Sequence, residues 1–309
     1  MCCLFGLIDY RRTLTVRQRN QIISALAASC EVRGTDATGI AYHSGGRLRI
    51  FKRPLPGHLM RFSIPRDAHV IMGHTRMATQ GSARKNYNNH PFLGAVDTGA
   101  FALAHNGVLW NDHALRTRFG LPGTKIETDS YIGVQLIERA GTLDFASLRD
   151  MAEQLEGSFT ITVLDPEDHL YIVKGDNPFC LYHFPAQGLY LYASTSAILM
   201  QALRKIRMQM GTPQEVHILC GELLRIGREG KIMNASFDDR NLFASPFRPF
   251  LTESLRNSPL RRSKPERTHL DELRCVAMTF GYAPEDVDRL AAQGFTPDEL
   301  EELFYCGEL

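Results

Sequence analysis

The sequence predicts an α+β protein, in which helices are layered against largely antiparallel sheets. Three observations lead to that prediction. A short apolar run at residues 4–8 opens the chain and is typical of a buried strand. An amphipathic helix is expected at 16–31. The elements then follow in the order strands, two helices, strands, helix and strands.

Each element is indicated by local signals. Thr15 and Gln18 match a capping box before the first helix. Two short strands around the glycines at 45–46 predict a hairpin, and the polar stretch 77–98 predicts a long functional loop. Further strands are expected at 69–72, 101–105, 159–164, 170–173, 181–184 and 189–193, helices at 129–139, 148–155 and 197–208, and a last hairpin from 215–219 and 222–226.

Composition and charge argue against several classes of protein. The chain has 309 residues, enough for one or two domains at roughly 150 residues each. A net charge of +1 gives no global attraction to nucleic acid or membrane. The apolar runs are too short for a bilayer, and no signal peptide is expected. Seven scattered cysteines without a Cys-x-x-Cys pair disfavour a disulfide framework or a zinc site, so a reducing, cytoplasmic location is expected.

The chain divides into a large domain at 2–243, a linker and a small tail. Residues 244–268 are basic and interrupted by prolines, which predicts a linker. The alternative, a nucleic-acid patch, is disfavoured because interleaved aromatic residues are absent. The tail at 269–309 contains two similar units, 281–290 and 294–303, and predicts short helices. Its acidic face is either solvated or docks on another protein.

The first residues carry a candidate nucleophile. If Met1 is removed, Cys2 bears both a thiol and a free α-amine, and the two groups titrate close together near neutral pH. The amine can then act as the base for the thiol. Read alone, Cys2 fits better as an ordinary cysteine near the start of a chain, since cysteine is often buried.

Several motifs accompany Cys2. They are residues 73–81 (GHTRMATQG), 88–92 (NNHPF), 104–108 (AHNGV) and 127–129 (ETD), with further matches at 33–39 and 155–159. In this order they resemble the glutaminase domain of class II glutamine amidotransferases, which are N-terminal-nucleophile hydrolases, and in particular the domain that opens glucosamine-6-phosphate synthase. The resemblance covers about residues 2–226. It implies a four-layer αββα sandwich that needs neither a cofactor nor a metal.

The resemblance implies that Cys2 attacks the side-chain amide of L-glutamine, forming a thioester and releasing ammonia before water gives glutamate. The oxyanion of that step needs fixed donors. The side-chain amide of Asn106 and the backbone N–H of Gly107 match the family's oxyanion hole. Read without the resemblance, Asn106-Gly107 at a strand end is the signature of a turn.

Free glutamine carries two further charges. Arg76 and Thr79 match the residues that bind its α-carboxylate, for which a guanidinium and a hydroxyl are suited. Asp129 matches the residue that binds the α-ammonium. Alone, Asp129 is an ordinary acid at a helix start. His74 and His105 are expected to be structural, and the resemblance gives His90 no role derivable from its chemistry.

Some positions depart from the family. Cys3 replaces a usual glycine, Met77 replaces the tryptophan that closes the ammonia path in the sugar synthase, and Gln80 replaces a histidine. Because of these changes, the resemblance does not identify the residues that gate the passage of ammonia in this chain. The roughly eighty residues after 226 form no acceptor domain, so an ammonia-accepting partner, docked through the C-terminal helices, is one expectation. Hydrolysis of another amide or peptide-like substrate and a non-catalytic interaction module are the alternatives.

Overall fold

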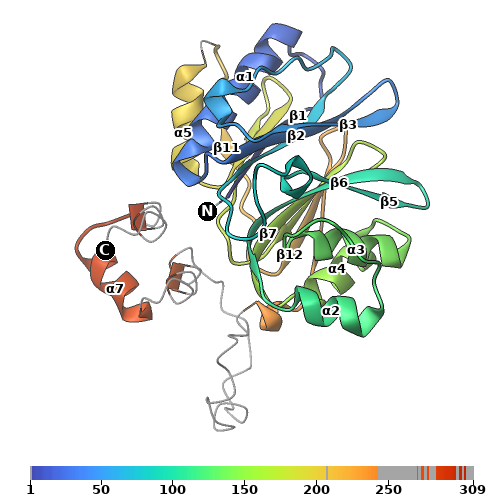
Figure 1. The fold of residues 1–309 in the computed structure, drawn as a ribbon. Coiled ribbons are helices and arrows are strands. Elements are labelled where there is room, and N and C mark those ends of the chain that lie inside the picture. The colour runs from blue at the N-terminus through green and yellow to red at the C-terminus, as the bar shows by residue number, and fades with distance from the viewer. Residues whose placement is uncertain are drawn as a thin grey trace.

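The computed structural model describes residues 2–206, 208–242, 270, 273–274, 277, 283–296, 299–300 and 303. Two antiparallel sheets are stacked face to face, and helices cover both outer faces (Figure 1). The order of layers is helix, sheet, sheet, helix. The predicted four-layer α+β class is confirmed.

The first sheet has seven strands with the start of the chain at its centre. Their spatial order is β11 (Gln214–Glu215), β9 (Cys180–Phe184), β10 (Leu189–Ala193), β1 (Cys3–Asp9), β4 (Val70–Arg76), β2 (Ala37–Ser44) and β3 (Arg47–Arg53). β1 pairs with β10 on one side and with β4 on the other, where Cys3 lies opposite Thr75. Because both edges of β1 are hydrogen-bonded, Cys2 directly precedes a strand that is fixed on both sides.

The second sheet has six strands. Their spatial order is β13 (Ile232–Ser236), β12 (Glu222–Ile226), β8 (Leu170–Lys174), β7 (Gly157–Leu164), β6 (Gly99–Leu109) and β5 (Phe92–Val96). β6 spans 11 residues and pairs with β5 along its first half and with β7 along its second half. It is therefore held in position over its whole length.

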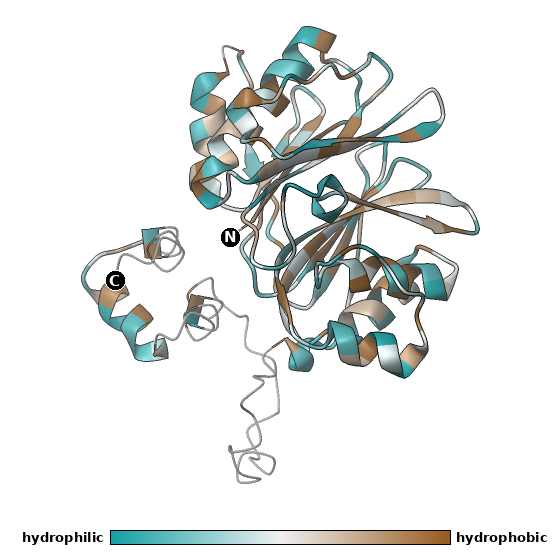
Figure 2. Ribbon diagram, in the orientation of Figure 1, coloured by the Kyte–Doolittle hydropathy of each residue, from teal (hydrophilic) through white to brown (hydrophobic). Residues whose placement is uncertain are grey.

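Helices cover the outer faces of both sheets. The first sheet packs against α1 (Val16–Ser29) and α5 (Ser196–Lys205), and the second against α2 (Asp112–Phe119), α3 (Tyr131–Ala140) and α4 (Phe145–Gln154). Short 3₁₀ turns lie at Cys30–Arg33, Gly57–Leu59, Asn86–Asn88 and Asp239–Asn241, and α7 (Pro284–Ala292) lies in the tail. Apolar residues concentrate in the strands and on the inner helix faces, while polar residues face outward (Figure 2). Within the described part of the chain, no helix is long and apolar enough to span a bilayer.

Side chains on the strands alternate between two apolar layers. The layer between the sheets contains even-numbered residues of three strands, namely Leu4 and Ile8 of β1, Val70 and Met72 of β4, and Ala102 and Ala104 of β6. Odd-numbered residues of β1, such as Phe5 and Leu7, pack outward against α1 and α5. This period of two decides on which side of the sheet each residue at the strand ends projects.

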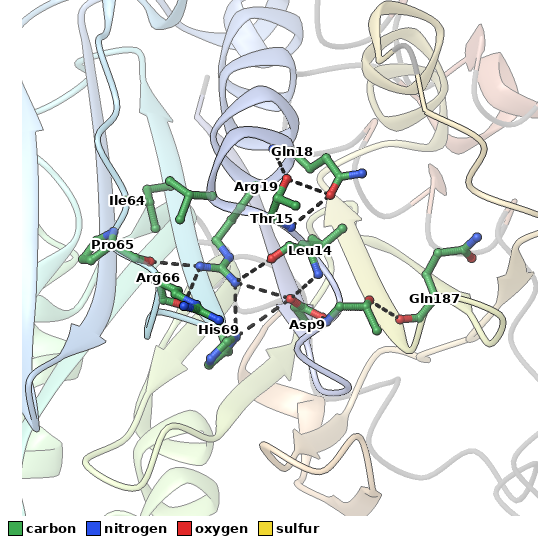
Figure 3. A network of polar contacts seen from close by, with 12 residues as sticks. Asp9, Leu14, Thr15, Gln18, Arg19, Ile64, Pro65, Arg66, His69 and Gln187 are labelled. Atoms are coloured by element: carbon green, nitrogen blue, oxygen red, sulfur yellow. Dashed lines mark hydrogen bonds and ion pairs between the residues drawn. The ribbon is translucent and has the colours of Figure 1, made fainter.

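A buried polar network around Asp9 anchors the end of β1 that is away from Cys2 (Figure 3). Asp9 accepts hydrogen bonds from the backbone N–H groups of Thr13 and Leu14 and forms an ion pair with Arg19 at 3.4 Å. Arg19 also donates to the carbonyl oxygens of residues 65 and 66, just before β4. The paired and hydrogen-bonded charges join β1, α1 and the start of β4 into one unit.

Some predicted elements differ from the observed ones. Helix α1 ends at Ser29, and its last predicted residues form a 3₁₀ turn. The hairpin predicted from 215–219 and 222–226 is wrong, because β11 pairs with β9 whereas β12 pairs with β13 and β8. The predicted loop 77–98 contains β5, and α2 was not predicted.

Asn106 and Gly107 do not end a strand or form a turn. Both lie inside β6, which continues to Leu109 because β7 pairs with it along that stretch. In the tail, α7 begins within the first of the two predicted repeat units, 281–290, and continues past it to Ala292. The predicted linker at 244–268 lies outside the described residues, as do 297–298 and 301–302 of the second repeat unit.

Candidate active site

Three predicted site residues continue the layer between the sheets. Cys2 lies two residues before Leu4, just ahead of β1, while Arg76 and Asn106 lie two residues after His74 on β4 and Ala104 on β6. All three keep the even parity of the strand residues that face this layer. Cys2 lies beside Arg76, because Cys3 is paired with Thr75 in the antiparallel register. His74 Nε2 lies 3.0 Å from the carbonyl oxygen of His105 and so joins β4 to β6 across the two sheets. The three side chains therefore converge at one end of the sandwich.

Cys2 lies at the edge of this layer and is partly exposed as a residue. Its Sγ atom is 3.7 Å from the carbonyl oxygen of Met77, and Arg33 Nε donates to the Cys2 carbonyl oxygen at 3.1 Å. Burial raises the pKa of the Cys2 thiol, while the Met77 backbone and the positive charge of Arg76 act in the opposite direction. The negative charge of Asp129 raises this pKa further, so the electrostatic fields of Arg76 and Asp129 both reach the sulfur.

The guanidinium of Arg76 is buried and held by three acceptors. Nη1 donates to Asn89 Oδ1 at 2.8 Å, and Nη2 donates to the carbonyl oxygens of Gln80 and Gly81. An arginine has five N–H donors, so three such bonds fix the side chain and leave donors for a ligand. Burial lowers the pKa of Arg76, and nearby negative charges oppose that shift.

Asn106 is fully buried, and neither polar atom of its side chain has a hydrogen-bond partner among the described residues. Buried amides are nearly always paired, and an unpaired one calls for an explanation such as a ligand site. The neighbouring Gly107 has a φ of +136°, and a Cβ atom there would lie 1.9 Å from the carbonyl oxygen of Ser158. A side chain at position 107 is therefore excluded by both conformation and space.

Asp129 lies just before α3 and is nearly buried. Its Oδ2 accepts a hydrogen bond from the backbone N–H of Leu109 at 2.7 Å, which places the carboxylate at the end of β6. Its own backbone N–H donates to Gln80 Oε1 at 2.9 Å. Thr79 is exposed in the loop that follows β4, between the Arg76 and Gln80 positions. Arg76, Thr79 and Asp129 thus surround the same end of the sandwich as Cys2.

Three buried histidines lie behind the site. The ring of His90 lies against that of His74, tilted by 35° with centroids 4.2 Å apart, and His105 Nδ1 lies 2.7 Å from the Ser130 hydroxyl. Burial lowers the pKa of all three, to about 3 for His74, so they are neutral at physiological pH. Within the described residues, no group of three or more His, Cys, Asp or Glu side chains could hold a metal ion.

Cys3 belongs to a different environment from Cys2. Its side chain points outward, and its Sγ atom lies 2.9 Å from Cys30 Sγ. Burial opposes ionisation of Cys3, but the contact with Cys30, the charge of Arg33 and hydrogen bonds to Ser194 outweigh it and lower the pKa of Cys3 to about 7. Ser194 also accepts a hydrogen bond from the backbone N–H of Leu4. Replacing the family's glycine at position 3 therefore changes packing beneath α1, on the face away from Asn106.

Sequence reasoning missed three residues that hold the site together. Arg33 binds the Cys2 carbonyl oxygen, Asn89 anchors Arg76, and Gln80 contacts both Arg76 and Asp129. The motifs at 33–39 and 88–92 marked the first two positions without assigning them a role. Gln80 was noted only as a departure, and no pattern in the sequence indicates its contacts.

Comparisons with known proteins agree with this geometry. A sequence profile described as a glutamine amidotransferase domain matches residues 62–218. Glutamine–fructose-6-phosphate aminotransferase of Sulfurisphaera tokodaii is 26% identical over 276 residues, covering 84% of this chain and 45% of the relative. The enzyme of the same name from Geobacillus kaustophilus is 30% identical over 235 residues, covering 74% and 36%. The chain thus spans less than half the length of these relatives.

Solved structures share the fold. Glutamine phosphoribosylpyrophosphate amidotransferase from B. subtilis, in complex with ADP and GMP, aligns with a TM-score of 0.61 at 20% identity, over 77% of this chain and 49% of that one. A structure titled as the allosteric regulatory enzyme of purine biosynthesis also has a TM-score of 0.61, at 22% identity, over 79% and 50%. At these identities the likeness concerns the fold alone.

The fold and the profile match together define a class II glutamine amidotransferase domain of the N-terminal-nucleophile type, and the chain belongs to that family. Within the family it is similar to the domain of glucosamine-6-phosphate synthase, as the two aminotransferase relatives indicate.

Proposed function

We propose that this protein hydrolyses the side-chain amide of L-glutamine to glutamate and ammonia, with Cys2 as the nucleophile. One observation carries the proposal. Asn106 is a buried amide without a described partner, and it lies two residues after Ala104 on β6. The period of two along a strand therefore directs it toward the layer between the sheets, where the same argument puts Cys2 and Arg76. A fixed donor group that is not used by the protein itself is what an oxyanion requires.

The proposed mechanism begins with processing that ends immediately before Cys2. The α-amine of Cys2 then takes the thiol proton, because the thiolate is the nucleophilic form of cysteine. The thiolate forms a C–S bond with the amide carbon of glutamine. The protonated amine returns its proton to the leaving nitrogen, the C–N bond breaks and ammonia departs. Water, deprotonated by the same amine, cleaves the thioester to glutamate.

Binding and stabilisation are assigned to the remaining residues. The Asn106 side-chain NH₂ and the Gly107 N–H are the proposed donors to the oxyanion. The free donors of Arg76 and the hydroxyl of Thr79 receive the α-carboxylate. The Asp129 carboxylate receives the α-ammonium, and its bond from the Leu109 N–H keeps it at the end of β6.

The primary test is glutamate release from glutamine by purified protein. Cys2→Ala should abolish turnover, because no other residue in this scheme can form the thioester. Cys3→Ala is the matched control, since Cys3 is adjacent in sequence but points toward Cys30 on the other face. We expect that variant to keep its activity within a few-fold of wild type. Turnover that survives Cys2→Ala would remove the mechanism.

A second test separates the thiol from the α-amine. A glycine inserted between Met1 and Cys2 keeps the thiol but converts the Cys2 amine into a peptide nitrogen, which is not a base. We expect loss of turnover, while iodoacetamide still labels Cys2. The mass of the intact wild-type protein should correspond to a chain that starts at Cys2. Full activity of the insertion variant would contradict the role of the amine.

The fate of the ammonia and the range of substrates follow as finer proposals. We propose that ammonia passes to an acceptor protein, for which the tail at 269–309 is the candidate docking segment. A panel of amides addresses the alternative substrate class. Turnover of a peptide-like amide without turnover of glutamine would favour that alternative, whereas the charged pair Arg76 and Asp129 supports a free amino acid.

A further inference from the structure

Gln80 makes direct contacts with both residues that the proposed function assigns to the charges of glutamine. Its side-chain Oε1 accepts a hydrogen bond from the backbone N–H of Asp129 at 2.9 Å. Its carbonyl oxygen accepts one from Arg76 Nη2, which also donates to the Gly81 carbonyl oxygen at 2.9 Å. Gln80 itself is exposed, so these contacts do not arise from packing in an apolar core.

The two contacted residues belong to different parts of the fold. Arg76 ends β4 in the first sheet, whereas Asp129 precedes α3, which covers the second sheet. The α-carboxylate and α-ammonium of an amino acid are attached to one carbon atom, so their separation is fixed. Two groups that bind them simultaneously must keep a matching separation, and a displacement of about 1 Å is costly in such sites.

A second contact joins the same two segments farther from Arg76. Lys85 forms an exposed ion pair with Glu127, so the loop after β4 and the segment before α3 are also linked at the surface. Exposed pairs of this kind contribute little to stability. Lys85 therefore offers a control that perturbs the same two segments without touching Arg76 or Asp129.

We propose that Gln80 is a positioning residue that fixes the separation of Arg76 and Asp129 and thereby selects substrates carrying both an α-carboxylate and an α-ammonium group. The inference rests on the proposed function. Gln80 contacts no reacting atom in this scheme, so its loss should weaken recognition of the zwitterion and leave the reactivity of Cys2 intact.

The experiment compares four proteins: wild type, Gln80→Ala, Gln80→Glu and Lys85→Ala. Gln80→Ala removes the acceptor for the Asp129 N–H, and we expect KM for glutamine to rise about tenfold with kcat changed less than about threefold. Gln80→Glu keeps an acceptor oxygen at the same reach and should restore KM to within about threefold of wild type. Lys85→Ala should match wild type.

Two further measurements exclude a general structural defect. The preference for glutamine over glutaramate, which lacks the α-ammonium group, should fall about tenfold in Gln80→Ala and stay unchanged in Lys85→Ala. The rate at which iodoacetamide alkylates Cys2 should be the same in all four proteins. An unchanged KM and preference in Gln80→Ala, or an equal rise of KM in the Ala and Glu variants, would overturn the positioning role. Failure of the proposed function itself is distinguishable, because wild type would then hydrolyse no glutamine.

Discussion

The two sides of the site are held in different ways. Cys2 directly precedes β1, which is paired on both edges, and Asn106 lies within β6, where β7 pairs with it. Thr79 and Gln80 lie in an exposed loop, and the position of Asp129 depends on a few individual hydrogen bonds. Continuous strand pairing therefore holds the strand side, whereas separate hydrogen bonds hold the loop side.

This difference suggests a division of labour. Bond making tolerates little displacement of the reacting groups, so the nucleophile and the oxyanion donors gain most from rigid strands. In the proposed scheme, recognition of the α-ammonium depends on Asp129, whose position is set by individual hydrogen bonds, and Thr79 of the loop adds to the binding of the α-carboxylate by Arg76. We therefore expect substitutions on the strand side to lower kcat and substitutions on the loop side to raise KM.

The largest effect should come from Asn106 on the strand side. Asn106→Ala removes a donor to the oxyanion and should lower kcat about 10²- to 10³-fold, with a much smaller change in KM. Asn106→Asp is the sharper variant, since it keeps the size of the side chain but cannot donate when ionised. Steady-state kinetics on glutamine measure both. If Asn106→Asp retained a kcat within about tenfold of wild type, Asn106 would not be the donor.

A smaller effect is expected from Asp129 on the loop side. Asp129→Asn removes the negative charge but keeps an oxygen that can accept the Leu109 N–H. We expect KM for glutamine to rise about 10- to 100-fold while kcat changes little, because the charge contributes to binding. Glu127→Gln removes a nearby exposed charge and serves as the control. A fall in kcat at constant KM for Asp129→Asn would contradict the expectation that loop-side substitutions act on KM.

A third prediction concerns His74, whose ring contacts the His105 carbonyl oxygen and so links β4 of the first sheet to β6 of the second. Burial lowers the pKa of His74 to about 3 in the folded protein, against 6.5 when it is unperturbed. Between these values the unfolded chain binds a proton that the folded protein does not, so stability falls as pH falls below about 6.5. For His74 alone the loss between about pH 7.5 and about pH 5 is about 2 kcal/mol.

Other buried groups modify this dependence. Lowered pKa values of His90 and His105 act in the same direction as His74. Asp176 opposes them, because burial raises its pKa to about 6 and its folded form gains a proton first. Urea unfolding at both pH values, for wild type and His74→Gln, measures the contribution of His74. Between the two pH values, the free energy of unfolding should fall about 2 kcal/mol less in the variant than in wild type. An identical fall would show that His74 does not titrate as argued.

Local signals in the sequence predicted the helices, whose caps and apolar spacing can be recognised within a short segment. The Thr15–Gln18 capping box is present, and α1, α3, α4 and α5 lie within a few residues of the predicted helices. Pairing partners were harder, because the short strands around 215 and 222 each had more than one possible neighbour. Asn106-Gly107 was expected at a strand end, since nothing in the dipeptide indicates that β7 continues beside it.

For the site, the resemblance and the charges of glutamine carried the prediction of the residues. The structure adds the period of two, by which Cys2, Arg76 and Asn106 share the parity of the strand residues that face the layer between the sheets. The contacts of Gln80 could not be predicted, since they depend on how a polar loop folds back toward α3. Residues that anchor others, such as Asn89 and Arg33, leave no periodic signal at all.

The buried ion pair between Asp9 and Arg19 has a consequence for the other end of β1. A strand with a period of two presents the opposite set of side chains if it slides by one residue past its neighbours. Anchoring Asp9 to α1 resists such sliding, together with the ladders that pair β1 with β4 and β10. The side of the sheet on which each of the two consecutive cysteines projects therefore depends in part on an ion pair at the distant end of the strand, far from the proposed site.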